Sequence, residues 1–174
     1  MDLSYIHLHN HSEFSILDGC LKTSALVEAA FKNNMPAVAL TDHGNIFGAV
    51  QFFKAAKAKG IKPIIGCEVY VAPGSRFDKK PDPAGGANHY HLVLLVKNEK
   101  GYANLCRLLT DSYLKGFYYR PRIDKELLSG HAEGLIGLSS CLKGEVNYLL
   151  QRGLDEKAEA AALEYASFFA KGDF

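Results

Sequence analysis

Short apolar runs alternate along the chain with longer segments whose apolar residues recur at helical spacing. Runs rich in Val, Ile and Leu predict strands, whereas a spacing of i, i+3, i+4 and i+7 predicts helices. Strands are predicted at residues 5–11, 37–41, 62–71, 91–96 and 134–139. Helices are predicted at residues 23–34, in a segment ending near 59, at 99–114, at 124–128 and through the C-terminal tail. This alternation indicates an α/β fold with a parallel sheet, for which closure into a barrel is one usual outcome.

Local signals refine several of these elements. Thr23 is a candidate N-cap for the first helix, and Gly60 is a candidate C-cap for the second. The apolar side of the second helix is predicted to contain Ala49, Val50 and Phe53. A loop rich in Pro and Gly, ending near residue 88, precedes the fourth strand. In the tail, helical spacing is kept by Ala158, Ala161, Ala162, Tyr165, Phe168 and Phe169.

Composition fits a soluble globular chain of 174 residues, enough for one domain or most of one. The net charge of +1 argues against strong nonspecific binding to nucleic acid, so any DNA binding would need a local site. Four cysteines without a CxxC pair favour a reducing, cytoplasmic compartment. The N-terminus lacks the pattern of a secretory signal, and no apolar run reaches the ~18–20 residues of a membrane helix, so no membrane contact is expected.

The candidate chemistry begins with HLHNHSEFSILDG, which places His7, His9 and His11 at alternate positions. Alternate residues of a strand share one face, so the three imidazoles are predicted to point the same way. A hydrophobic core gains little from imidazole, whereas a metal ion gains ligands. An HxH pair makes metal binding about as plausible as an ordinary polar role for these residues.

Further ligand-type side chains follow the predicted strands, where α/β folds gather their chemistry. They are Asp18 after the first strand, Asp42 and His43 after the second, Glu68 late in the third, and Cys141 after the fifth, while His89 and His91 flank the start of the fourth. Imidazole, carboxylate and thiolate donors suit zinc, or manganese or iron if the thiolate is not a ligand. These donors exceed the needs of one tetrahedral ion and favour two or three ions. Such a site binds phosphate oxygens and activates water, which indicates phosphoester hydrolysis.

Several of these residues also fit plainer roles. Cys141 alone fits a small buried hydrophobe, and Asp42 fits a helix cap or a carboxylate that orients a histidine. The run FYYRPR offers Arg120 and Arg122 for nucleic-acid contact by stacking and phosphate pairing. A packed loop with solvated charges is the more common arrangement for such a run.

Five segments in order carry a family resemblance: LHNHS, TDHGN, GCEVYV, HLVLLVKN and GLIGLSSC. With GFYYRPRID, they make the chain resemble the PHP (polymerase and histidinol phosphatase) family, in the form found at the N-terminus of bacterial DNA polymerase III alpha subunits. The resemblance implies a distorted seven-stranded barrel of the (β/α)7 type with up to three metal ions. Matched by position, the implied ligands are His9, His11, Asp18, His43, Glu68, His91 and Cys141. His7 and Asp42 would contact and orient these ligands without binding metal themselves, and His89 is the alternative to His91.

The chain departs from the family pattern at its end. The family's last Asp-x-His motif has no match, and five strands are predicted where seven are expected. We therefore expect residues 1–174 to be a single PHP domain, truncated before the last strands of its barrel, without the palm, fingers and thumb of the polymerase.

For function, the resemblance implies a metal-dependent 3′→5′ exonuclease or phosphoesterase, with His9, His11, His43 and Glu68 acting through bound metals. The full-length chain would synthesise DNA, with magnesium in its polymerase part. Implied partners are DNA, the other polymerase domains, a proofreading exonuclease subunit and other replisome subunits. The alternatives are a non-catalytic module that docks the proofreading subunit and a free-standing phosphatase resembling histidinol phosphatase.

Overall fold

The computed structural model describes residues 5–80 and 86–174. Residues 81–85, which belong to the predicted Pro- and Gly-rich loop, lie outside the described residues. The chain divides into two compact parts, residues 1–67 and 68–174, and each is described by itself. The fold is mixed α/β, as predicted, and strand β2 (Lys62–Val71) contributes to both parts.

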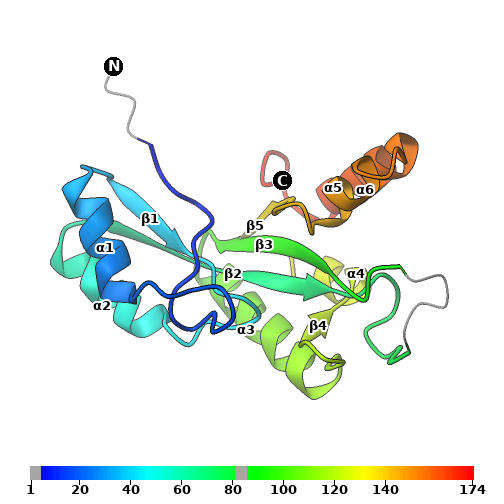
Figure 1. Ribbon diagram of the computed structural model, residues 1–174, viewed down its shortest axis with the longest axis horizontal. Coiled ribbons are helices and arrows are strands. Elements are labelled where there is room, and N and C mark those ends of the chain that lie inside the picture. The colour runs from blue at the N-terminus through cyan, green and yellow to red at the C-terminus, as the bar shows by residue number, and fades with distance from the viewer. Residues whose placement is uncertain (1–4, 81–85) are drawn as a thin grey trace. The chain divides into compact units, whose positions relative to one another are not determined.

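The first part contains α1 (Thr23–Lys32), β1 (Ala37–Leu40), α2 (Ala49–Ala58) and the beginning of β2 (Figure 1). β1 pairs in parallel with β2, with Ala37 opposite Lys62. Every residue of β1 is buried, as expected for a parallel strand covered on both faces. The core of this part is formed by Leu26, Val27, Ala30, Val38, Leu40, Phe52, Ala56 and Ile61.

The predicted strand at residues 5–11 is wrong, because this segment follows β1 without forming a regular ladder. The Ala39 N–H donates to the His7 carbonyl and the Thr41 N–H donates to the Asn10 carbonyl. The segment therefore advances three residues while β1 advances two, which inserts one extra residue as in a β-bulge. The Asn10 side-chain amide donates to the Ala39 carbonyl at 3.0 Å and takes the place of a backbone donor.

The ends and faces of α1 and α2 differ in detail from the sequence predictions. Thr23 is the first helical residue of α1 instead of its N-cap. In α2 the buried residues include Ala49 and Phe52, while Val50 and Phe53 are 64% and 45% exposed. The buried residues keep helical spacing, but the buried face of α2 is rotated by one residue from the predicted face. The sequence could not decide between the two faces, because Phe52 and Phe53 are adjacent and either could have pointed into the core.

Gly60 confirms the predicted end of α2. It follows the helix with φ +72°, the left-handed conformation that glycine adopts without a steric penalty.

The second part contains the end of β2 and all of the remaining described elements (Figure 1). They are β3 (Tyr90–Val96), α3 (Glu99–Leu114), β4 (Arg122–Ile123), α4 (Lys125–Ser129), β5 (Leu135–Leu138), α5 (Glu145–Leu150) and α6 (Asp155–Phe168). β2 pairs in parallel with β4, and β3 lies between β2 and β5. β3 and β5 are antiparallel, so the prediction of an entirely parallel sheet is wrong. The apolar pattern predicted both strands, but it carries no information about strand direction.

The C-terminal tail is helical, as predicted, and forms two adjacent helices, α5 and α6. Tyr165 of α6 is buried and donates through its hydroxyl to Glu145 of α5 at 2.9 Å. Lys125 of α4 donates to Glu145 at 3.0 Å and to Glu164 at 2.6 Å. Burial, together with the nearby Glu145 carboxylate, raises the pKa of Tyr165 far above its ordinary value. This network ties the tail to α4.

Among the described residues, none of the helices combines the length and the hydropathy that crossing a membrane would require.

Close backbone packing between α3 and the segment before β5 generates a stability prediction. A Cβ atom on Gly101 would lie 1.8 Å from the Gly134 carbonyl oxygen, a contact with backbone that side-chain rotation does not relieve. We expect Gly101→Ala to lower the free energy of unfolding by about 1–3 kcal/mol or more, measured by urea denaturation. Gly74→Ala is the matched control, because a Cβ atom there meets nothing within 4 Å. Equal stability of the two variants would contradict the prediction.

Candidate metal centre

Three predicted ligands of the first part of the chain lie together. The Asp18 carboxylate oxygen Oδ2 is 2.9 Å from His43 Nε2 and 3.4 Å from His11 Nδ1. The rings of His11 and His43 have centroids 4.0 Å apart. One donor atom from each residue lies within 4.8 Å of the others, so these three side chains could hold a metal ion. We call them the N-terminal cluster.

Asp42 explains how this cluster is positioned. Its carboxylate is fully buried and accepts hydrogen bonds from the Ser12 N–H at 2.6 Å and from the Ser12 and Ser15 hydroxyls, both at 2.7 Å. The Ser15 hydroxyl oxygen accepts from the His43 N–H at 3.0 Å. The Ser15 carbonyl accepts from the Asp18 N–H at 3.0 Å. Asp42 therefore fixes the loop on which Asp18 sits. The two serines were missed in the sequence, although they stand among the ligand-type residues that follow the HxH pair.

The three alternate histidines do not behave as a set. The ring of His9 lies edge-on to that of His11, with centroids 5.1 Å apart. The ring of His7 instead packs edge-on against Tyr5 at 4.7 Å. Because the segment is bulged and not a regular strand, simple alternation does not apply along it.

The second part of the chain holds another group of predicted ligands. Glu68, only 1% exposed near the end of β2, accepts from His91 Nδ1 at 2.9 Å. The Cys141 sulfur lies 3.7 Å from the same Glu68 oxygen and 3.9 Å from His91 Nδ1. A carboxylate, an imidazole and a thiol thus meet in one place. We call these three residues the C-terminal cluster.

A tight turn after β5 brings the thiol to this cluster. Ser140 adopts φ +65° and donates its hydroxyl to Glu68 at 2.6 Å. The Cys141 carbonyl accepts from the Gly144 N–H, and the Lys143 carbonyl accepts from the His91 N–H. A Cβ atom on Gly144 would lie 2.0 Å from the Ser139 carbonyl oxygen, so the turn needs glycine there. The role of Ser140 was missed in the sequence, although SSC had marked this strand end.

His89 lies beside this cluster. Its ring stacks on that of His91 with centroids 5.7 Å apart, and Tyr70 packs edge-on against both. Burial, followed by the positive charges of His91, Arg120 and Lys143, lowers the pKa of His89 to about 4. His89 is therefore a neutral imidazole at neutral pH.

The two arginines predicted to contact nucleic acid have different surroundings. Arg122 is buried, and its guanidinium donates to the carbonyl oxygens of Gly116, Asn88 and Asp78. Burial also lowers the pKa of Arg122. Its donors are used within the chain. Arg120 is half-buried and lies over the ring of Tyr70 at 5.8 Å.

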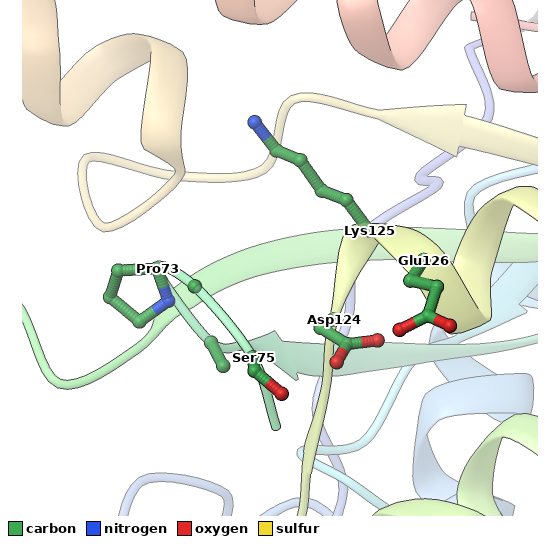
Figure 2. Close-up of a pocket in the computed structure, with 7 residues that line it drawn as sticks. Pro73, Ser75, Asp124, Lys125 and Glu126 are labelled. Carbon is green, nitrogen blue, oxygen red and sulfur yellow. The ribbon is translucent and has the colours of Figure 1, made fainter. Parts of the chain in front are cut away.

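A separate hollow of about 310 Å³ adjoins α4 and shares no residue with either cluster (Figure 2). It is lined by Ala72, Pro73, Gly74, Ser75, Asp124, Lys125 and Glu126. Figure 2 shows the carboxylates of Asp124 and Glu126 close together, with Lys125 pointing away from them. Asp124 is bonded to the Arg76 guanidinium at 2.8 Å and caps α4 by accepting from the Leu127 N–H. The Asp124 carboxylate in this hollow therefore stabilises the fold.

The buried Asp42 carboxylate generates a second stability prediction. In Asp42→Asn, the amide NH2 would face a serine donor and one of the three charge-assisted hydrogen bonds would be lost. We expect the free energy of unfolding to fall by about 1.5–3 kcal/mol. Urea denaturation measures it, with Asp155→Asn on the exposed start of α6 as the matched control. A loss no larger than that of the control would refute the positioning role of Asp42.

Comparisons with known proteins agree with the sequence resemblance. The PHP domain family model matches residues 7–174. The chain is 51% identical over 172 residues to the DNA polymerase III subunit alpha of Treponema pallidum, covering 99% of this chain and 15% of that protein. It is 50% identical over 170 residues to the same subunit of Thermus aquaticus, covering 96% of this chain and 14% of that protein.

A solved amidohydrolase from Chromobacterium violaceum is 25% identical, with a TM-score of 0.43, and covers 61% of this chain and 31% of its own. That likeness is remote and assigns no activity. The chain spans only a small part of its curated relatives, 15% and 14% of their length. On the family match, the chain belongs to the PHP domain family.

Proposed function

We propose that this chain is the PHP domain of a replicative DNA polymerase alpha subunit, and that it binds divalent metal ions to hydrolyse phosphoesters. The observation that carries the proposal is the gathering of three ligand-type side chains at each of two places, the N-terminal and C-terminal clusters. The match to DNA polymerase III alpha subunits supports the polymerase context.

The N-terminal cluster fits a divalent ion by the chemistry of its donors. Two imidazoles and one carboxylate suit zinc, manganese or iron. The oxygen of Asp18 already lies near both imidazoles, at 2.9 Å from His43 and 3.4 Å from His11. Asp42 holds the supporting loop through buried hydrogen bonds, which limits the reorganisation that ion binding would require. His9, whose ring neighbours His11, is the proposed additional ligand.

The C-terminal cluster favours zinc more strongly, because a thiolate is a soft ligand. Glu68 is a buried carboxylate, and burial of such a charge requires compensation. The Ser140 hydroxyl and the His91 ring supply part of it, and a cation beside Cys141 would supply more. Two clusters support the binding of two or three ions in total. The sequence-based idea that all seven ligands serve one multinuclear centre stays a prediction.

When bound, divalent ions would polarise a phosphoryl oxygen and lower the pKa of a nearby water molecule. The chain's own residues would prepare this chemistry. His9, His11, His43 and Glu68 are the proposed catalytic residues, since they would hold the ions against the substrate. Ser140 would keep Glu68 in one orientation, with its hydrogen bond of 2.6 Å.

The proposed substrate is the 3′-terminal phosphodiester of a DNA strand, because the relatives are subunits of a DNA polymerase. In that context the rest of the alpha subunit would carry DNA synthesis with magnesium. A proofreading exonuclease subunit, other replisome subunits and DNA would be the partners, and the cytoplasm would be the compartment.

Metal content tests the proposal directly. After dialysis with zinc and then against buffer, elemental analysis should find two or three equivalents per chain. His43→Ala and Cys141→Ser should each lose about one equivalent, because each removes one donor from a site that has only three or four. His131→Ala is the control, since His131 binds the Leu127 carbonyl and belongs to neither cluster. Zinc at background in the wild-type chain would contradict the proposal.

Cobalt substitution adds a test of the thiolate alone. A cobalt-loaded chain should show thiolate-to-metal charge-transfer absorption, which Cys141→Ser should remove and Cys20→Ser should leave in place, since Cys20 is an exposed cysteine outside both clusters.

Hydrolysis of a 3′-labelled single-stranded oligonucleotide tests the activity. The zinc-loaded chain should release the terminal nucleotide, and His9→Ala should reduce release to the background rate, while His131→Ala should retain it. Activity retained in His9→Ala would remove the proposed mechanism. Metal binding without hydrolysis of DNA would favour the docking module, and turnover of a phosphomonoester alone would favour the free-standing phosphatase.

A further inference from the structure

The segment between α3 and β4 is a tight turn that the chain holds firmly. The Tyr118 N–H donates to the Arg120 carbonyl at 3.0 Å across the turn. The buried Arg122 guanidinium lies 5.0 Å from the centre of the Tyr118 ring and binds the carbonyls of Gly116 and Asp78 at 3.3 and 2.7 Å. These contacts fix the conformation of residues 116–122.

The tip of this turn is an exposed aromatic residue in an unfavourable backbone conformation. Tyr119 has φ +57°, a region that bulky residues rarely occupy, and its side chain is 77% exposed. Within the part of the chain that the structure describes, its ring lies beside that of Tyr118, with centroids 4.7 Å apart. Because the ring is exposed, its burial does not offset the unfavourable backbone conformation. Strained residues of this kind concentrate at functional sites.

Two cations flank the C-terminal cluster on the same part of the chain. Arg120, next to Tyr119, lies over the ring of Tyr70, which in turn packs against His91. Lys143 is exposed, and its backbone N–H donates to the Cys141 sulfur at 3.5 Å. Within residues 5–80 and 86–174, no carboxylate lies within ion-pair distance of either cation.

We propose that Tyr119, Arg120 and Lys143 form a binding track for single-stranded nucleic acid that leads to the C-terminal cluster. A base would stack on Tyr119, and backbone phosphates would pair with Arg120 and Lys143. A single strand fits because its bases are free to stack, whereas those of a duplex are paired inside the helix. With a net charge of only +1, binding has to come from such a local track. The role of the track in delivering a strand end rests on the proposed function, but binding itself does not.

Fluorescence anisotropy with a labelled oligothymidylate, in buffer with EDTA, tests binding without metal or hydrolysis. Tyr119→Ala should weaken binding by roughly 5- to 150-fold, the range measured for loss of one base stack. Arg120→Ala and Lys143→Ala should each weaken binding and reduce the slope of log affinity against log salt by about 0.7. Tyr102→Ala and Lys171→Ala, exposed residues of α3 and of the C-terminal segment, are the matched controls and should bind like the wild type.

Tyr119→Gly separates binding from folding. Glycine accepts the positive φ without strain, so this variant should melt about 2–4 °C higher than the wild type while it binds as weakly as Tyr119→Ala. A purely structural tyrosine would give the opposite change in melting temperature.

Unchanged affinity in the triple Ala variant would overturn the track. Equal affinity of the wild type for a duplex of the same length would also overturn it. Because the assay contains no metal, its outcome is independent of the zinc measurements. Failure of zinc binding with loss of affinity in these variants would remove the proposed function and leave the track. Normal zinc binding with unchanged affinity would remove the track alone.

Discussion

Both clusters depend on the requirement that a buried carboxylate must be hydrogen-bonded. Asp42 and Glu68 are 0% and 1% exposed, and each draws its donors from the loops that carry candidate ligands. Asp42 takes the backbone and hydroxyl of Ser12 and the hydroxyl of Ser15. Glu68 takes the hydroxyl of Ser140. A buried carboxylate without hydrogen-bond donors would destabilise the fold by several times the net contribution of an ordinary hydrogen bond. The loops that supply the donors are therefore held in place, and with them the candidate ligands that they carry.

This arrangement also accounts for the strained backbone of Ser140. Among the described non-glycine residues, positive φ values occur at Asn34, Tyr119 and Ser140. Asparagine tolerates the left-handed region well, so Asn34 requires no special explanation. Ser140 gains a short hydrogen bond to Glu68 in return for its conformation. Among the described residues, none gives Tyr119 a comparable contact, and we relate its conformation to the proposed track.

Much of the fold could be predicted from the sequence where one local signal dominates. The bounds of β2 and α3 agree with the prediction, because β2 is a long apolar run and the Asn98 side chain caps α3. The segment at 5–11 was mispredicted, since the Asn10 amide takes a ladder position that no periodicity reveals. The direction of β5 and the existence of the short β4 were also not predicted, because both depend on tertiary pairing.

Ligand types could be predicted at strand ends, whereas the serines that position them could not, since serine is common on any loop. Arg120 and Arg122, separated by Pro121, likewise differ in their surroundings: Arg122 is buried and donates to backbone carbonyls, whereas Arg120 is half-buried.

The contact between Gly101 and Gly134 constrains how this chain can diverge. A Cβ atom on Gly134 would lie 2.5 Å from the Gly101 nitrogen, just as one on Gly101 would strike the Gly134 carbonyl. Each glycine faces main chain of the other, and the Asn98 side-chain oxygen would also lie 2.3 Å from a Cβ atom on Gly134. Because main chain of the partner glycine remains in place whatever its side chain, a second substitution cannot compensate for loss of the first. The two positions are therefore expected to be inherited as a pair. In a distant homologue that lacks either glycine, we expect α3 to be displaced from β5 as a rigid unit. Substitution at these two positions would therefore change the placement of the helix before it changed the ligands.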